Sequence, residues 1–317
     1  MAQPTDAAST YDLVAGDRED IADIIYDVSP VETPGLTRFK KGKATATYHE
    51  WLVDALNAAA TNYVIEGNDA VTDAATTKVK RGNYTCISDK SPLVTGTQEV
   101  IKKVSIDSEM AYQMENKMKE LKRDIEKMLW DNNARVAGND TLAREAGGMP
   151  AYIFTNVSKD SGSTNSTGDG TDGFTASGTT RALTEALVEA ALALAWAEGG
   201  NPSWGNMGSF QKRKFATFTG NTTRTQEVNT PRKLVNTVDV YVDPLGNEIE
   251  LVPNRHCVAG IVTFVDPAYV KFATLRNFRS KDLAVTGDYV RKQILAEWTL
   301  EVCNEKAHAE VCDLTTS

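Results

Sequence analysis

The sequence predicts an α+β fold with one long helix, a projecting two-stranded ribbon and many strands in its last third. Three patterns support this prediction. Apolar residues recur at helical spacing over 107–137, β-type residues flank a polar tip within 39–90, and apolar and polar residues alternate after residue 225. With 317 residues, 41% of them hydrophobic and 24% charged, the chain has globular composition and needs neither a disulfide nor a metal for stability.

Residues 1–38 are expected to form an arm without a core of its own. The segment is rich in Ala, Thr and Asp and contains one short helical pattern, Asp20 to Ile25. Pro30 and Pro34 then interrupt regular structure. Because such a segment buries little apolar surface, we expect another surface to hold it.

Residues 39–90 predict a long two-stranded excursion. β-type residues lead from Ala44 to Trp51, a polar tip follows at 66–70, and a second β-type run returns over 78–87. An isolated hairpin is marginal in water, and this one has few large apolar residues besides Trp51 and Tyr84. We therefore expect the ribbon to lie on a partner surface.

Residues 107–137 give the clearest helical pattern. Asp107 or Ser108 is a candidate N-cap, and Gly138 is a candidate C-terminal stop. The apolar positions form a single stripe, and Glu115 can pair with Lys119 on the polar side. The stripe consists of Met110, Met114, Met118, Leu121, Ile125, Met128 and Leu129.

The middle region, 139–224, predicts mixed structure. Tyr152 to Phe154 has strand character, and Ser158 to Gly178 has the Ser, Thr, Gly and Asp content of a mobile loop. A second amphipathic helix is expected from Thr179 to the Gly199-Gly200 pair. Its predicted apolar positions are Leu183, Leu187, Ala191, Leu194 and Trp196.

The last part of the chain predicts two hairpins. The first runs from Val238 to Leu251 around the turn Asp243–Asn247. The second alternates over 296–302, turns at Asn304-Glu305-Lys306 and returns over 307–311. Between them we expect a buried strand at 258–265 and a short helix at 267–275.

No enzyme motif is supported by its context, so we predict no catalytic or cofactor-binding residues. Gly168 to Gly173 has the spacing of a dinucleotide-binding loop, but a polar tract precedes it where that motif requires a buried strand. A flexible loop is the better interpretation. A dinucleotide-dependent enzyme that uses this loop is a distant alternative. The two aspartates of the loop would bind calcium only weakly, because no Glu stands where an EF-hand-type loop would end.

The cysteines and histidines predict no metal site. Cys86, Cys257, Cys303 and Cys312 form no C-x-x-C pair, and the three histidines show no zinc-like spacing with them. We interpret them as reduced thiols and hydrogen-bonded histidines. No membrane segment is expected either, because Glu185 and Glu189 interrupt the longest apolar stretch.

The charges allow three interpretations of one basic cluster. The formal net charge of −9 argues against a nucleic-acid-binding role for the whole surface. Two segments of the chain, 38–43 and 78–81, are nevertheless rich in Lys and Arg, and we expect one ribbon to carry both groups of basic residues. They can contact phosphate, form a solvated base of the ribbon or meet an acidic neighbouring subunit, and we favour the last.

Eight short motifs, in order over residues 32–314, carry a family resemblance. They are Glu32–Pro34, Gly42–Thr45, His49–Trp51, Gly82–Thr85, Gly96–Glu99, Leu121–Glu126, Glu297–Leu300 and Asn304–His308. On these motifs the chain resembles the major capsid proteins of tailed bacteriophages, which have the HK97-like fold. Within that group it resembles the SU-type major head protein family.

This resemblance implies a division of the chain into named parts. They are an N-terminal arm (1–38), an E-loop (39–90), a peripheral domain (91–148) with a spine helix (107–137), an axial domain (149–224), a peripheral-domain hairpin (225–256), a second axial segment (257–278) and C-terminal peripheral strands (279–317).

The resemblance also implies a structural role in the virion. The protein would assemble in the host cytoplasm into hexamers and pentamers of an icosahedral shell around double-stranded DNA, bound without sequence specificity. Separate scaffolding, portal and decoration proteins are implied partners, and an encapsulin-like nanocompartment is the alternative. The expected inter-subunit residues are Lys40, Lys41, Lys43, Trp51, Glu66, Asp69, Lys80, Arg81 and Tyr84.

Overall fold

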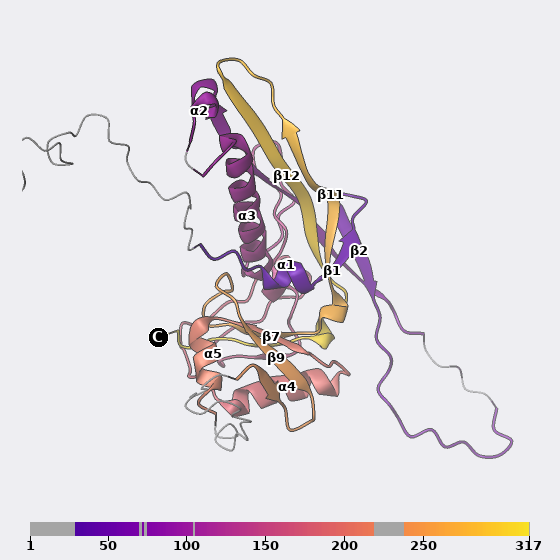
Figure 1. The fold of residues 1–317 in the computed structure, drawn as a ribbon. Coiled ribbons are helices and arrows are strands. Elements are labelled where there is room, and N and C mark those ends of the chain that lie inside the picture. Colours follow the sequence, from indigo (N-terminus) through magenta and orange to yellow (C-terminus); the bar gives the residue numbers. More distant parts are fainter. Residues whose placement is uncertain (1–28, 70–71, 73–74, 104, 219–237, 317) are drawn as a thin grey trace, which may run out of the picture.

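The computed structural model describes residues 29–69, 72, 75–103, 105–218 and 238–316. It has an elongated upper body, a lower body around a second sheet, and a ribbon that extends away from both (Figure 1). The helical pattern at Asp20–Ile25 lies outside the described residues, as does 219–237. Pro34, expected to interrupt regular structure, instead begins the short helix α1 (Pro34–Arg38).

The upper body forms around the long helix α3 (Glu109–Trp130). Ser108 caps it, since its Oγ accepts a hydrogen bond from the amide of Ala111 at 3.2 Å. Met110, Leu121, Ile125 and Leu129 are buried. The other three methionines of the stripe are partly buried against the same core as the two leucines and Ile125. The predicted Glu115–Lys119 ion pair is present at 2.7 Å, so the helix and its apolar stripe are confirmed.

The helix ends earlier than the sequence predicts. We expect it to reach 137, but the backbone is extended already at Asp131, with φ −71° and ψ 148°. Asn132 instead binds Phe174 in both directions, donating to its carbonyl at 2.6 Å and accepting from its amide at 2.8 Å. Asn133 donates to the carbonyl of Ala146 at 2.8 Å. These side chains compete with continued helical hydrogen bonding, so Gly138 is not the stop.

A five-stranded sheet covers α3. Its strands are β1 (Lys40–Lys43), β11 (Val270–Asp282), β12 (Tyr289–Val302), β4 (Cys86–Lys90) and β5 (Leu93–Thr95), with helix α2 (Gly96–Val100) after β5. The predicted helix at 267–275 is wrong. Only a 3₁₀ turn, η3 (Pro267–Tyr269), precedes β11, because Val270, Phe272 and Thr274 favour an extended chain, and Phe272 stacks on Trp298 at 5.3 Å.

The lower body is built on a six-stranded sheet in the order β6-β13-β10-β7-β9-β8. The strands are β6 (Val157–Ser158), β13 (Ala309–Val311), β10 (Val262–Val265), β7 (Trp204–Met207), β9 (Glu248–Pro253) and β8 (Val240–Val242). Helices α4 (Glu185–Ala197) and α5 (Ser209–Phe215) flank it (Figure 1). The predicted turn at 243–247 is confirmed, with Gly246 at φ 88°.

Three predictions for this body need correction. The hairpin β8–β9, expected beside the long helix, pairs through β9 with β7. The chain after Lys306 does not return along β12, but passes through η4 (Glu305–Ala307) and crosses to the second sheet as β13. Tyr152 to Phe154 forms no strand. It follows the 3₁₀ turn η1 (Met149–Ala151), and the side chains of Tyr152 and Ile153 are buried.

Helix α4 also differs from its prediction. It begins after Thr184, not at Thr179, and ends before Gly199 as predicted. Its buried residues are Val188, Ala191, Leu192 and Ala195, so Leu194 and Trp196 face outward, contrary to the expected stripe. Two of the buried residues, Ala191 and Ala195, are small, which allows the helix to approach β13 closely.

The loop at 158–178 packs against the body. Phe174 is buried, and Gly168 lies directly against the ring of Phe154. With φ of 70°, Gly168 occupies a backbone region that a side chain would strain. The Gly168–Gly173 segment is an irregular turn without a preceding strand or a following helix, as its sequence context indicates.

Buried Glu126 joins the two bodies. Its carboxylate accepts hydrogen bonds from the amides of Gly35 and Leu36 in α1, both at 2.8 Å. It also accepts from Trp130 Nε1 at 2.8 Å and from Asn254 Nδ2, after β9, at 2.9 Å. One side chain of α3 thus holds the arm helix and the second sheet.

We expect Glu126→Gln to lower the free energy of unfolding by about 2–4 kcal/mol, because an amide NH₂ would face a cluster of donors. Urea unfolding of the purified subunit measures this. Glu120→Gln, on the partly exposed side of the same helix, is the matched control and should change stability by at most about 0.5 kcal/mol. Equal stability of the two variants would contradict the role of Glu126.

Candidate assembly surface

The ribbon consists of a paired root and a long free loop. Strands β2 (Tyr48–Val53) and β3 (Val79–Tyr84) form an antiparallel pair whose register runs from Tyr48↔Tyr84 to Val53↔Val79. Beyond Val53 the two arms continue outward without strand pairing and turn at Glu66-Gly67 (Figure 1). The predicted excursion and its polar tip are therefore present. The ribbon spans 48–84, which is shorter than the predicted 39–90.

Aromatic packing and one arginine fix the root to the body. Trp51 is only 9% exposed, and its ring lies 5.9 Å from that of Tyr152. Arg135 donates to the hydroxyl of Tyr48 at 2.7 Å and to the carbonyl of Gly82. Tyr152 donates to the same carbonyl at 3.1 Å. The direction in which the ribbon leaves the body is thus defined by packing within the chain.

Polar contacts reinforce the root along β12. Asn83 is fully buried and exchanges hydrogen bonds with Gly147, while also donating to the carbonyl of Leu300 at 2.9 Å. His49 Nε2 lies 3.1 Å from Glu301, which also binds Lys271 at 2.9 Å. Burial raises the pKa of Glu301, but hydrogen bonds from Lys271 and His49 outweigh it and leave the pKa lowered.

The free loop exposes apolar side chains that a stable monomer would bury. Every described residue from 54 to 80 is exposed, and Leu56, Tyr63 and Ile65 are 98%, 93% and 84% accessible. Asn68 donates to the carbonyl of Ile65 at 3.0 Å, which closes the tip. A contiguous exposed apolar segment of this kind is typical of a surface that another protein covers.

The basic cluster predicted to lie on one ribbon is divided between two sheets. Lys40, Lys41 and Lys43 belong to β1, which pairs in parallel with β11, whereas Lys80 and Arg81 belong to β3. The sequence could not reveal this, because β1 finds its partner about 230 residues later in the chain.

Several of the predicted interface residues contact their own chain. Lys40 donates to the carbonyl of Ala268, and Lys41 donates to that of Leu36. Lys80 pairs with Glu50 at 2.7 Å.

The other predicted positions divide between the root and the tip. Arg81 lies over the ring of Phe154, and Tyr84 packs on Tyr48 at 4.7 Å. Glu66 and Asp69 remain exposed at the tip.

The prediction missed the most exposed apolar residues of the ribbon. Leu56 and the run Tyr63-Val64-Ile65 lie in the free loop. The sequence contains a signal for them. They are apolar residues beside a polar turn, and their spacing fits neither a half-buried strand nor an amphipathic helix. The sequence instead predicts Trp51 and Tyr84 at the interface, and both pack on other rings of their own chain.

The described residues contain no group of three or more metal-binding side chains close enough to share an ion. Cys86 and Cys312 are buried thiols, and Cys257 and Cys303 are partly buried.

Among the residues that the structure describes, no helix has both the length and the apolar character required to cross a bilayer.

Comparison with known proteins identifies the family. The family model described as SU10 major capsid protein matches residues 3–315. The chain belongs to this family. The curated major capsid protein of Escherichia phage Phieco32 is 34% identical to this capsid protein over 144 residues, which are 45% of the chain. That match spans 40% of the length of the curated relative.

Solved structures show the same fold. The chain superposes on a subunit of the cyanophage A-1(L) capsid with a TM-score of 0.71 and 12% identity, covering 96% of this chain and 99% of the other. A subunit from a phage G structure with major capsid and decoration proteins gives a TM-score of 0.55 and 10% identity, covering 99% and 100%. The predicted HK97-like phage capsid fold is therefore confirmed. The family match makes the chain a structural protein of a phage capsid.

We expect Trp51→Ala to destabilise the subunit itself by about 3–5 kcal/mol, because Trp51 fills space within its own chain. Leu52→Ala is the matched control, since Leu52 is 64% exposed in the same strand. It should cost at most about 0.5 kcal/mol. Thermal unfolding of the unassembled subunit measures both. A stable Trp51→Ala subunit that fails only in assembly would restore the interface role expected from the sequence.

Two buried titratable groups near the C-terminus predict opposite pH effects. Burial lowers the pKa of His308 to about 3, so it stays neutral, and its Nδ1 accepts from the amide of Asp266 at 3.2 Å. Burial raises the pKa of Glu310 to about 7, while Thr263 donates to it at 3.0 Å. Between pH 4.5 and 7 folded Glu310 binds more protons than unfolded Glu310, so its contribution to stability is lost as the pH rises.

Glu310→Gln should remove this loss. We expect the stability of the variant relative to wild type to rise by up to about 3 kcal/mol between pH 4.5 and pH 8. Urea unfolding at both pH values measures the difference, and effects shared by the two proteins cancel. Exposed Glu115→Gln is the control. A constant difference across this range would show that folding does not raise the pKa of Glu310.

Proposed function

We propose that this capsid protein assembles through its free loop, residues 54–78, into hexamers and pentamers that close an icosahedral shell around double-stranded DNA. The observation that carries the proposal is the near-complete exposure of Leu56, Tyr63 and Ile65 on a segment whose root is rigidly held. Burying such a loop on a neighbour contributes about 25 cal/mol per Å² of apolar area.

The contact is heterologous. The loop leaves one side of the molecule, so it meets a different surface of the next copy, and a repeated contact of this kind closes into rings. Many modest contacts around a shell then add through multivalency. The rigid root favours this arrangement because the loop is presented in a fixed direction and less entropy is lost on contact.

The sheet topology supports a revised division of the chain. We assign residues 48–84 to the E-loop and α3 with the five-stranded sheet to the peripheral domain. The axial domain then includes the six-stranded sheet and therefore the hairpin β8–β9 and β13. Residues 1–38, which include α1, remain the proposed N-terminal arm.

The other proposed partners follow from the family. We propose assembly in the host cytoplasm with separate scaffolding and portal proteins, and a decoration protein on the outer face. Packaged DNA would meet the inner face without sequence specificity. The net charge of −9 favours weak contact with the genome, which can then slide during packaging and ejection.

Deletion of residues 55–76 tests the proposal. The β2–β3 pair would remain closed by a short loop of Asp54, Thr77 and Lys78, so we expect a folded subunit that forms no shells by electron microscopy. The full-length variant Tyr63→Ser, Val64→Ser, Ile65→Ser keeps the loop length and should also lose assembly. Normal shells from the deletion variant would refute the role of the loop.

A further inference from the structure

A groove lies between the ribbon and the lower body. Its volume is about 520 Å³, and it is lined on one side by ribbon residues 53–57, 75–77 and 79. The opposite wall includes Phe154, Val302 and the turn Asn304-Glu305-Lys306. The lining thus combines apolar side chains with polar ones, which come from the turn on one wall and from Asp54, Thr77 and Arg81 on the ribbon.

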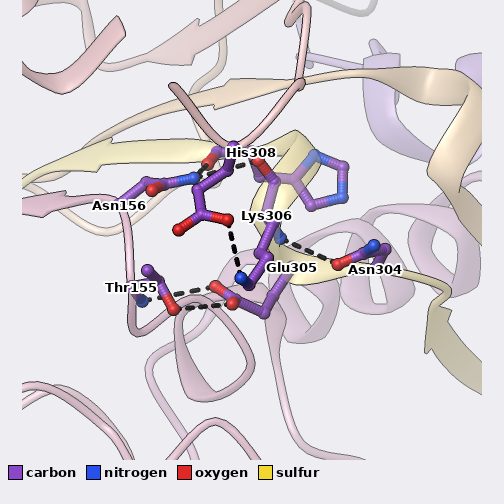
Figure 2. Close-up of polar contacts among 7 residues, drawn as sticks. Thr155, Asn156, Asn304, Glu305, Lys306 and His308 are labelled. Carbon is purple, nitrogen blue, oxygen red and sulfur yellow. Dashed lines mark hydrogen bonds and ion pairs between the residues drawn. The ribbon is translucent and has the colours of Figure 1, made fainter. Parts of the chain in front are cut away.

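The polar side chains of the turn are engaged within the chain (Figure 2). Glu305 accepts from the hydroxyl of Thr155 at 2.7 Å and from its amide at 3.3 Å. Lys306 pairs with Glu198 at 2.6 Å. Asn304 accepts from the amide of Lys306 at 3.1 Å. This wall therefore presents no convergent charge to an ionic small molecule.

The ribbon wall offers unpaired backbone. Pairing of the two arms ends at Val53↔Val79, and no backbone hydrogen bond joins 54–57 to 75–78, both of which are described in full. Ala55 donates to its neighbour Asp54 at 3.0 Å. Free N–H and C=O groups beside an apolar trough match an extended polypeptide, which supplies backbone partners and side chains together.

We infer that this groove holds an extended segment of a second copy of the chain. This inference rests on the proposed function and specifies which part of the ribbon root the neighbour enters. The groove is continuous with the exposed loop, since Leu56 lines it and is 98% accessible. A second copy that covers the exposed loop would also bury Leu56, whereas a small ligand in the groove would leave the rest of the loop exposed.

Hydrogen exchange of free subunits and assembled shells tests this occupant. We expect amides of 54–57 and 75–78 to exchange at least about tenfold more slowly in shells. If 63–65 become protected and these amides do not, the groove inference is wrong while the loop still mediates assembly. If none of these segments gains protection, both the inference and the proposed function are wrong.

A pair of matched substitutions gives an independent test. Thr77→Trp fills the groove, whereas Thr61→Trp places the same ring on the exposed loop outside the groove lining. Both subunits should show unchanged thermal unfolding. We expect Thr77→Trp to reduce the yield of shells at least tenfold more than Thr61→Trp. Equal yields from the two variants would overturn the assignment of the groove.

Discussion

The architecture depends on a single buried carboxylate. Glu126 accepts four hydrogen bonds that come from α1, from its own helix and from the segment after β9. Burying a charge is costly unless donors surround it, so the three elements must come together for any of them to be stable there. The arm helix, the long helix and the second sheet thereby acquire one fixed arrangement.

The ribbon shows the opposite balance of interactions. In its root the two strands pair along their backbones and the aromatic rings pack, whereas its loop has exposed side chains and unpaired backbone. The contrast separates two tasks along one segment. The root sets the direction in which the loop projects, and the loop retains apolar surface for contacts outside the chain.

Sequence patterns predicted the elements that depend on local periodicity. The apolar stripe of α3, the Ser108 cap and the turn at Gly246 follow from neighbouring residues alone. The errors involve distant partners. Asn132 ends α3 by binding Phe174, β1 pairs with β11, and β13 joins a sheet far from β12. For the assembly surface, the sequence predicts the tip. It assigns Trp51 to the contact between subunits, because the partner of its ring, Tyr152, lies about 100 residues away in the chain.

The long pairing of β11 with β12 has a mechanical consequence. Their ladder runs from Val270↔Val302 to Asp282↔Lys292 along the upper body. Antiparallel hydrogen bonds lie perpendicular to the strands, so a pull along this axis loads them in shear and they must rupture together. A force along the strands would therefore meet the ladder as a whole, which makes the upper body stiffest in this direction.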